Sequence, residues 1–178
     1  MEVRSYPDPV LRVKAAPVTA FDQALADLVQ EMTRTMHEAN GLGLAAPQVG
    51  VSTRIAIVSP DSEAGHEAVL VNPEITETDG WVESEEGCLS FPGVYVKIGR
   101  FARVRVKHQD VRGEVHEMEA ESLLARAVQH ELDHLDGRLL MDRMSSVQRL
   151  AQRRRLRELQ DRYERRTSRA GAGSSVAS

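Results

Sequence analysis

The 178-residue sequence contains a single cysteine, Cys88, so no disulfide can form within the chain. Aromatic residues make up only 4% of it, and the core is therefore expected to rest on Val, Leu, Ile and Ala. No run approaches 18 consecutive apolar residues, and the N-terminus is polar within its first eight residues. These features argue against a membrane span or a secretory signal, and they favour a cytoplasmic protein or a mature organellar form.

The charge of the chain is unevenly distributed. The formal net charge is −4, and the contents of 41% hydrophobic and 28% charged residues are ordinary for a globular protein. The segment 143–169 holds ten arginines against three acidic residues, a balance of +7, so the remaining residues carry −11. We expect one domain with its own core, followed by a basic segment that can meet an anionic partner.

The most specific pattern is His130-Glu131-Leu132-Asp133-His134, two histidines four residues apart with a glutamate after the first. On an α-helix this spacing directs both imidazoles from one face, so that they can hold one metal ion. In metal hydrolases with this motif the glutamate is a general base for a metal-bound water. The pattern therefore predicts a metal site with His130 and His134 as ligands and Glu131 as a catalytic residue.

The motif lies in a helix predicted over about 122–136, and Gly137 is expected to end it. Apolar residues recur through this helix at helical spacing and predict that it is buried. They are Leu123, Leu124, Ala127, Val128 and Leu135. Buried histidines and acids need partners, because an unsatisfied buried polar group costs about 2–7 kcal/mol. A metal ion supplies such a partner.

Shorter patterns predict the rest of the fold. A first helix spans 21–40, and another helical stretch covers about 145–166. Five short runs predict strands, at 54–58, 68–71, 95–98, 103–107 and 115–118. A polar turn at 59–65 separates the first two, and residues 170–178 form a flexible end. We expect an α+β fold, with a largely antiparallel β-sheet packed around the central metal-binding helix and a helix at the C-terminus.

The identity of a third ligand separates several kinds of metal hydrolase, because catalytic sites usually take three protein ligands. One class of such hydrolases takes its third ligand from a histidine six residues after His134. Leu140 stands at that position, so this class is excluded. A second would need a glutamate downstream, and the nearby candidate, Glu158, lies in the arginine-rich segment, a poor place for a buried ligand. Cys88 lies upstream between Gly87 and a turn-forming Phe-Pro-Gly sequence. A Cys, His, His set with one open position is chemically reasonable.

Three separated segments resemble the signatures of bacterial peptide deformylases and occur in the same order. Residues 41–48, Gly-Leu-Gly-Leu-Ala-Ala-Pro-Gln, match GxGLAAxQ, and residues 86–90, Glu-Gly-Cys-Leu-Ser, match EGCLS. Residues 129–137 match QHExDHLxG. Tyr6-Pro7-Asp8-Pro9 and Val71-Asn72-Pro73 are also typical of that family. The similarity covers about residues 1–145, with no substitution at a functional position of the three motifs.

The resemblance implies removal of the formyl group from N-formylmethionine at the start of nascent polypeptides, with release of formate. It implies that Cys88, His130 and His134 bind one divalent metal ion. This ion is iron(II) in the family's native enzymes, and zinc, nickel or cobalt can occupy the site. Glu131 would take a proton from the metal-bound water and later deliver it to the departing amine.

The resemblance also assigns groups that would bind the substrate. The Gln48 side-chain amide and the Leu89 backbone N–H would hold the oxyanion beside the metal, each donor being worth about 3–4 kcal/mol. An amide suits this role independently, because it donates hydrogen bonds without titrating. Gly43 and Leu44 would offer backbone hydrogen bonds to an extended peptide, in the manner of an added strand.

The methionine side chain needs an apolar pocket, for which Leu42, Leu123 and Ala127 are the candidates. Plain core packing is the alternative for these three residues. Glu86 and Asp133 are candidates for orienting the metal ligands through hydrogen bonds. A structural salt bridge or a helix cap accounts for these two carboxylates equally well.

The resemblance divides the chain into a catalytic domain at 1–145, a basic helical extension at 146–169 and a flexible tail at 170–178. Arginine-rich helices bind phosphate backbones, so the extension is a candidate for docking to ribosomal RNA near the peptide exit tunnel. A solvated terminal helix is the alternative.

Two other functions account for parts of the sequence. A zinc endopeptidase that shares only the HExxH motif would not need Cys88 to bind metal. A noncatalytic RNA-binding protein that uses the arginine helix would not need Glu131. The joint presence of Gln48, Cys88 and Glu131 favours the deformylase over both.

Overall fold

The structure is a computed structural model that describes residues 1–59, 61 and 65–173, and for residues 170–173 it describes the backbone alone. The polar turn predicted at 59–65 and the flexible end predicted at 170–178 therefore lie partly outside the described residues. Among the helices of this described part, none is long and apolar enough to cross a membrane.

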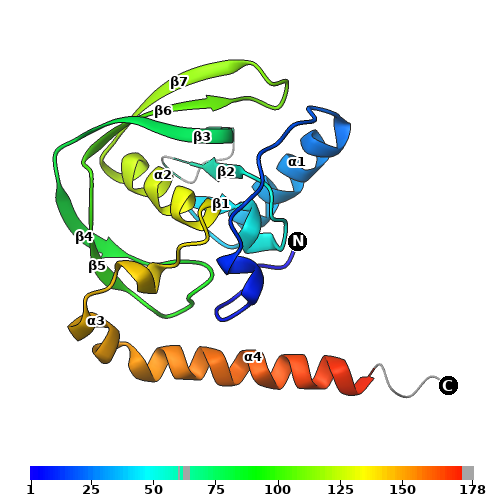
Figure 1. The fold of residues 1–178 in the computed structure, drawn as a ribbon, viewed down its shortest axis with the longest axis vertical. Helices are drawn as coiled ribbons and strands as arrows, with labels where there is room; N and C mark the ends of the chain where they lie inside the picture. The colour runs from blue at the N-terminus through cyan, green and yellow to red at the C-terminus, as the bar shows by residue number, and fades with distance from the viewer. Residues whose placement is uncertain (60, 62–64, 174–178) are drawn as a thin grey trace.

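Two antiparallel sheets form the β-structure (Figure 1). The larger sheet has the strand order β1-β2-β3-β6-β7. Its strands are β1 (Gly43–Ala45), β2 (Ile55–Val58), β3 (Ala68–Asp79), β6 (Arg103–Gln109) and β7 (Val115–Glu121). The smaller sheet pairs β4 (Val82–Glu86) with β5 (Val96–Arg100). Figure 1 shows the helix α2 lying between the two sheets.

The first helix, α1 (Gln23–Glu38), begins where Asp22 caps it, with the Asp22 side chain accepting a hydrogen bond from the Leu25 N–H. Its apolar stripe joins a buried cluster with residues of β1 and β2. The stripe consists of Leu25, Val29, Met32 and Met36. Three short 3₁₀ turns, η1 (Pro9–Arg12), η2 (Ala46–Val49) and η3 (Leu140–Arg143), connect the larger elements.

The helix α2 (Ser122–Leu135) carries the HExxH motif and packs on β1, β2 and β7. Every residue from 127 to 135 is buried, as predicted for this helix, but the prediction is wrong for Leu123, which is 49% exposed. Gly137 follows in the left-handed region, with φ +71°. Its N–H bonds the His134 carbonyl at 3.1 Å, and the Arg138 N–H bonds the Asp133 carbonyl at 2.8 Å. This pair of bonds is a Schellman ending, and it fixes the turn that holds His134.

The C-terminal region differs from the single helix predicted at about 145–166. It contains α3 (Ser146–Ala151) and α4 (Arg153–Gly173), separated at Gln152. The apolar residues of α3 do not pack on the body, because Val147 and Leu150 are 75% and 67% exposed. Farther along, Leu156 and Leu159 are buried in a cluster that contains Phe91, so α4 packs against the body of the protein.

Two glutamines attach α3 and the start of α4 to strand β5. The Gln148 side chain donates to the Lys97 carbonyl at 2.7 Å, and the Gln152 side chain donates to the Tyr95 carbonyl at 3.2 Å. The two spacings match, because four helical residues advance about 6 Å and two strand residues about 6.8 Å.

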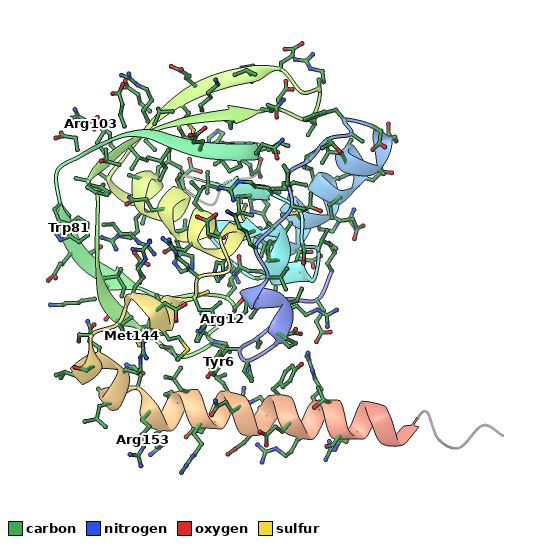
Figure 2. The ribbon with its side chains drawn as sticks, viewed as in Figure 1. Tyr6, Arg12, Trp81, Arg103, Met144 and Arg153 are labelled. Atoms are coloured by element: carbon green, nitrogen blue, oxygen red, sulfur yellow. The ribbon has the colours of Figure 1, made fainter. Side chains whose placement is uncertain are left out.

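The N-terminal arm also contacts α4. Gln160 donates to the Tyr6 hydroxyl at 3.0 Å, and the Tyr6 ring stacks on Phe91 with centroids 5.1 Å apart. Figure 2 shows Tyr6 near this helix and Arg153 on its solvent side. The loop that carries Cys88 and Phe91 is therefore held between the arm and α4.

The predicted α+β class is confirmed: antiparallel strands surround a central helix, and a helix lies at the C-terminus. The sequence patterns missed β1, β4 and the second half of β3. That half follows Pro73 and a register shift between Val71 and Glu74, and most of its side chains are exposed. The domain boundaries at 145, 146 and 170 stay predictions.

Candidate metal centre

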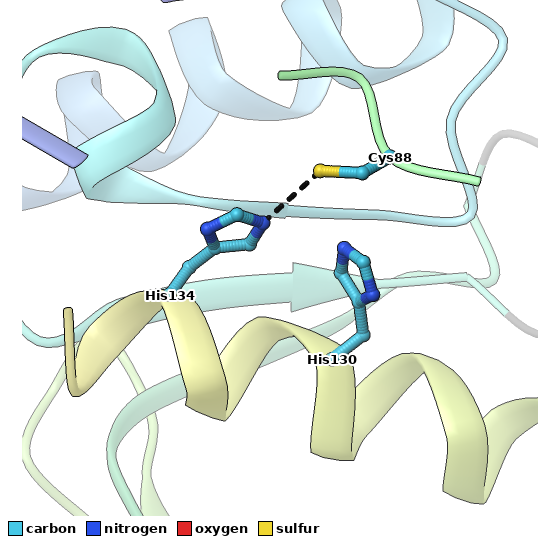
Figure 3. Close-up of side chains that lie close together, drawn as sticks. All are labelled: Cys88, His130 and His134. Carbon is cyan, nitrogen blue, oxygen red and sulfur yellow. Dashed lines mark hydrogen bonds between the residues drawn. The ribbon is translucent and has the colours of Figure 1, made fainter. Parts of the chain in front are cut away.

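Cys88, His130 and His134 come together from two separate parts of the fold. Cys88 lies on the loop after β4, and the two histidines lie one turn apart on α2. One ligand atom from each residue lies within 4.8 Å of the other two. The Cys88 Sγ is 3.2 Å from the His134 Nε2, and the three side chains face one another (Figure 3).

These separations fit one metal ion. Sulfur and nitrogen ligands at tetrahedral positions around an ion stand about 3.5 Å apart. The His130 Nδ1 is engaged by Glu86 at 3.1 Å, which leaves its Nε2 for a ligand bond. A thiolate with two imidazoles is a donor set that suits zinc and iron(II). The residues present therefore fit the predicted group.

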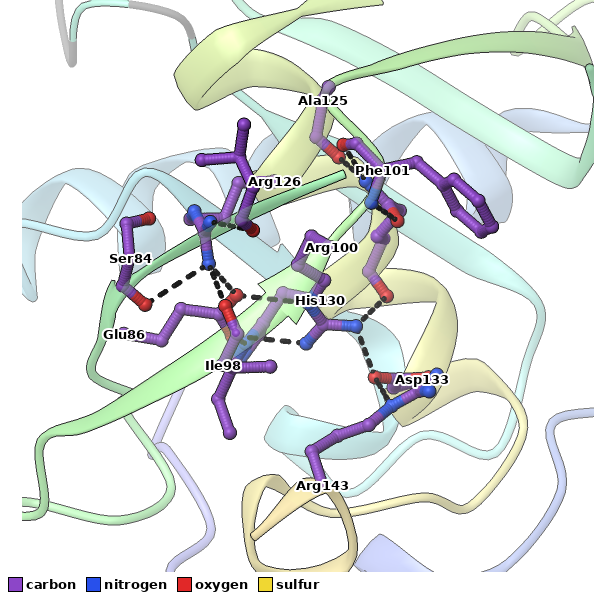
Figure 4. A network of polar contacts seen from close by, with 12 residues as sticks. Ser84, Glu86, Ile98, Arg100, Phe101, Ala125, Arg126, His130, Asp133 and Arg143 are labelled. Atoms are coloured by element: carbon purple, nitrogen blue, oxygen red, sulfur yellow. Dashed lines mark hydrogen bonds and ion pairs between the residues drawn. The ribbon is translucent and has the colours of Figure 1, made fainter. Parts of the chain in front are cut away.

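Glu86 connects His130 to two arginines (Figure 4). Its Oε1 accepts from Arg100 Nε at 2.9 Å and from Arg126 Nη1 at 2.5 Å, while its Oε2 accepts from Arg100 Nη2 at 3.0 Å. Burial opposes ionisation of Glu86, but the hydrogen bonds from His130 and Arg100 outweigh it and lower its pKa to about 2. Glu86 is therefore an anion that accepts a hydrogen bond from the Nδ1–H of His130.

Asp133 lies at the other end of the same network. Its Oδ2 accepts from Arg100 at 2.6 Å and from Arg143 Nε at 2.9 Å, and its Oδ1 accepts from Arg143 Nη2 at 2.5 Å. The Asp133 side chain makes no hydrogen bond to His130 or His134 within the described residues, so its connection to the ligands runs through Arg100 and Glu86. Figure 4 shows this chain of contacts.

Glu131 lies buried beside the ligands. Its Oε2 has no hydrogen-bond partner among the described residues, and it lines the cavity described below. Burial raises its pKa to about 7, because the opposing charges of His130 and Arg100 compensate only partly. A carboxyl group with this pKa can both accept and return a proton near neutral pH.

Gln48 is held with its amide nitrogen toward Cys88. Its Oε1 accepts from the Ala45 N–H at 2.8 Å, within the turn η2. Its Nε2 donates to the Ser90 hydroxyl at 3.2 Å and lies 3.7 Å from Cys88 Sγ. One end of the amide is thus fixed by the backbone, and the donor end faces the candidate metal centre.

A cavity of about 500 Å³ opens beside these groups. Gln48, Cys88, Leu89, His130 and Glu131 line it. The three residues predicted for the methionine pocket, Leu42, Leu123 and Ala127, line it as well, and so does Gly43, which is predicted to bind the peptide through its backbone. Leu123 is 49% exposed, so it borders this cavity rather than filling the core. The Leu44 side chain differs, because it is fully buried in the cluster under α1.

The comparisons with known proteins identify the family. The family model described as polypeptide deformylase matches residues 1–150. The chain belongs to the polypeptide deformylase family. The peptide deformylase of Thermodesulfovibrio yellowstonii is 49% identical over 151 residues, covering 84% of this chain and 92% of that protein. The chain is thus an enzyme of the deformylase family, as the resemblance predicted.

Solved structures agree with this family assignment. Peptide deformylase 1B of Arabidopsis thaliana has a TM-score of 0.90 at 40% identity, with 94% of each chain covered. The peptide deformylase of Thermotoga maritima has a TM-score of 0.77 at 46% identity, covering 81% of this chain and 97% of that one. Deformylases are metal-dependent enzymes that remove the N-formyl group from nascent peptides.

The sequence patterns missed the arginines that hold Glu86. Arg126 lies four residues before His130, a helical spacing that could have placed both on one face of α2. Arg100 gives no such signal, because it comes from β5. A second group of possible ligands, Asp110, Glu114 and His116, lies at the β6–β7 turn. Arg112 pairs with both of its carboxylates, so that group reads as a surface ion-pair cluster.

Proposed function

We propose that this deformylase removes the formyl group from N-formylmethionyl ends of nascent polypeptides, with one divalent metal ion held by Cys88, His130 and His134. The observation that carries the proposal is the convergence of Glu131 and the Gln48 amide on the same cavity beside these three side chains. Such an ion would act as a Lewis acid and lower the pKa of a water molecule enough for attack near neutral pH.

Glu131 moves the proton in this scheme. Its carboxylate accepts a proton from the attacking water and donates it to the amine that leaves when the C–N bond breaks. Burial raises the pKa of Glu131, which favours holding the proton, and the positive charge of a bound ion would oppose this shift, which favours accepting the proton from water. The pocket wall of Leu42 and Leu123 excludes bulk water from part of this cavity.

Gln48 and Leu89 stabilise the negative charge that develops on the formyl oxygen. The Gln48 amide replaces its bond to Ser90 with a bond to this oxygen, at little cost because its Oε1 stays fixed by Ala45. The backbone N–H of Leu89, next to Cys88, supplies the second donor. Removal of one such donor costs about 10²–10³ in kcat.

The peptide lies along strand β1 in this proposal. That strand is at the edge of the five-stranded sheet, with β2 on one side. The backbone of Gly43 and Leu44 can then pair with an extended substrate, so a buried Leu44 side chain is compatible with the role. The first side chain of the substrate enters the cavity between Leu42, Leu123 and Ala127.

We assign iron(II) as the metal in the cell, with zinc, nickel or cobalt as substitutes. The donor set of one thiolate and two imidazoles accepts all of these ions. Anaerobic purification followed by metal analysis tests the assignment. Zinc without iron in such a preparation would contradict it.

Formate release from N-formyl-Met-Ala-Ser tests the reaction. The wild-type protein and Glu131→Ala are purified anaerobically and loaded with the same metal. We expect release by the wild type and a loss of at least about 10³-fold in the variant with equal metal content. No release from fully loaded wild type would overturn the proposal and favour an endopeptidase, which cleavage of unformylated peptides would reveal.

The exposed arginines of α4 are proposed to dock the enzyme on ribosomal RNA near the exit tunnel. Truncation before α3 is a poor test, because it also removes Leu156 and Leu159 from the cluster with Phe91. Replacing exposed arginines of α4 with glutamate leaves that packing in place. We choose three exposed arginines that form no ion pair within the described residues: Arg157, Arg162 and Arg165.

Ribosome pelleting compares this triple Arg→Glu variant with a control in which three exposed basic residues elsewhere are reversed, Lys14, Arg34 and Arg112. We expect binding that weakens with salt and is lost in the α4 variant alone. Equal pelleting of both variants would reject the docking. A substrate that emerges from the ribosome places the enzyme in the cytoplasm or in an organelle that makes proteins.

A further inference from the structure

Arg126 lines the cavity but has no part in the scheme above. It lies on α2 between Leu123 and His130, and it borders the cavity together with Leu123 and Ala127. Its side chain is only 11% exposed. Because its guanidinium is engaged by Glu86 and by carbonyls of the smaller sheet, we take the methylene stem to be the part of Arg126 that borders the cavity.

The guanidinium group of Arg126 spans the smaller sheet. Its Nη1 donates to the Ile98 carbonyl at 3.2 Å and the Ser84 carbonyl at 3.4 Å, and its Nη2 donates to the Val82 carbonyl at 3.3 Å. These three contacts are long for hydrogen bonds, so the group can still shift toward or away from Glu86. Figure 4 shows Arg126 with Ser84, Ile98 and Glu86 around it.

The same guanidinium contacts the carboxylate that orients a metal ligand. Its Nη1 donates to Glu86 Oε1 at 2.5 Å, and Glu86 Oε2 accepts from His130 Nδ1 at 3.1 Å. One side chain thus joins the wall of the cavity to the hydrogen bond that fixes the His130 ring. Two contacts connect Arg126 to His130: the Arg126–Glu86 ion pair and the Glu86–His130 hydrogen bond.

We propose that Arg126 is a positioning residue that couples filling of the pocket by the first side chain of the substrate to the orientation of His130. This inference rests on the proposed function. A methionine side chain packed on the stem restricts the rotamers of Arg126 and presses its guanidinium against Glu86. A short side chain leaves the stem unsupported, and the Glu86–His130 hydrogen bond is less well fixed.

Arg100 makes the proposal testable, because its contacts with Glu86 do not depend on Arg126. It donates two hydrogen bonds to Glu86, and its side chain is 4% exposed, deeper than Arg126. Replacement of Arg126 therefore leaves the buried carboxylate with a cationic partner. We expect Arg126→Met to fold and bind metal, because methionine retains the apolar stem while losing the guanidinium.

The first experiment compares formyl-Met-Ala-Ser with formyl-Ala-Ala-Ser as substrates. In the wild type we expect kcat to be about tenfold higher for the methionine peptide, a typical size for coupling between two sites. In Arg126→Met this kcat ratio falls to about one, whereas the KM ratio still favours methionine through Leu42 and Leu123. Arg105→Met is the matched control, since Arg105 pairs with two acids on the outer sheet and lies outside the cavity.

The second experiment observes His130 without turnover. Zinc-loaded protein labelled with ¹⁵N-histidine is titrated with the product peptide Met-Ala-Ser, and the His130 Nδ1 signal is assigned by its loss in His130→Gln. We expect a shift in the wild type that Ala-Ala-Ser does not produce and that Arg126→Met abolishes. Arg126→Lys, which keeps a charge near Glu86, should recover part of it.

Two results would overturn the inference. One is an unchanged kcat ratio in Arg126→Met, and the other is a His130 shift that persists without the guanidinium. If Arg126→Met does not fold, the same two measurements on Arg126→Lys decide the question. Failure of the wild type to release formate would instead count against the proposed function.

Discussion

Gly43 stands so close to Glu131 that a Cβ atom on residue 43 would lie 2.9 Å from the Glu131 carboxyl carbon. Gly43 does not have a positive φ, so its backbone conformation is open to any residue. The need for glycine at this position therefore comes from the neighbouring carboxylate. In the GxGLAAxQ motif, the second glycine provides the space in which Glu131 lies.

Gly43→Ala should displace Glu131 and lower kcat by about 10²-fold, the cost of a misplacement near 1 Å. Metal content and thermal midpoint should change little, because the three ligands and the backbone are not affected. Formate release and metal analysis on one preparation check this. An active Gly43→Ala enzyme would show that the carboxylate can move aside without loss.

Cys88→Ser should lower metal affinity by more than about 100-fold, since it removes a ligand rather than a group that orients one. A zinc endopeptidase of the HExxH type would retain its metal after the same change. Metal analysis after dialysis against a weak chelator distinguishes the two. Chelation of the wild type should lower its thermal midpoint by about 5–10 °C, if the metal is present at about 100 times its dissociation constant.

Leu156→Ala should destabilise the protein by about 2–5 kcal/mol, because the side chain is buried with Phe91 under the Cys88 loop. Leu150→Ala is the matched control, and its 67% exposure predicts a change within about 0.5 kcal/mol. Urea unfolding measures both. Equal losses in the free energy of unfolding for the two variants would mean that α4 does not pack on the body in solution.

Asp142→Asn should remove part of the stability at neutral pH. Burial opposes ionisation of Asp142, but bonds from Arg12 and the Leu139 N–H outweigh it, so the pKa lies below its usual value. The stabilisation is therefore present above the ordinary aspartate pKa and is lost as pH falls through the lower folded pKa. Both side chains are partly exposed, and about 1 kcal/mol is the upper limit.

The measurement is the difference in thermal midpoint between wild type and Asp142→Asn at pH 6, 4 and 3. We expect this difference to shrink toward pH 3. A constant difference across the range would assign the effect to packing instead of charge.

The spacing of apolar residues predicted α1 and α2 well, because each helix packs an apolar face into the core. A capping residue also marks one end of each helix, Asp22 before α1 and Gly137 after α2. The break at Gln152 carried no such signal. It follows from the contacts of Gln148 and Gln152 with β5, which are distant in sequence. The prediction of one continuous helix there was wrong for that reason.

The residues of the candidate metal centre also differ in whether the sequence predicts them. His130, Glu131 and His134 follow from a spacing within one helix. Elimination among possible ligands left Cys88 as a candidate, and the resemblance to deformylases assigned it to the metal. Arg100 could not be found from the sequence, because its contacts with Glu86 and Asp133 depend on how β5 is placed against α2. Arginine is also commonly exposed, so its burial carried no advance signal.

The bonds from Gln148 and Gln152 to β5 have a consequence for the behaviour of the protein in crowded solution. β5 pairs with a single strand, β4, and a two-stranded ribbon leaves carbonyl groups on its outer side open to pairing with another molecule. The two glutamine amides occupy the outward carbonyls of Tyr95 and Lys97. The C-terminal region thereby takes up two acceptors that a strand of another molecule would need in order to pair with β5.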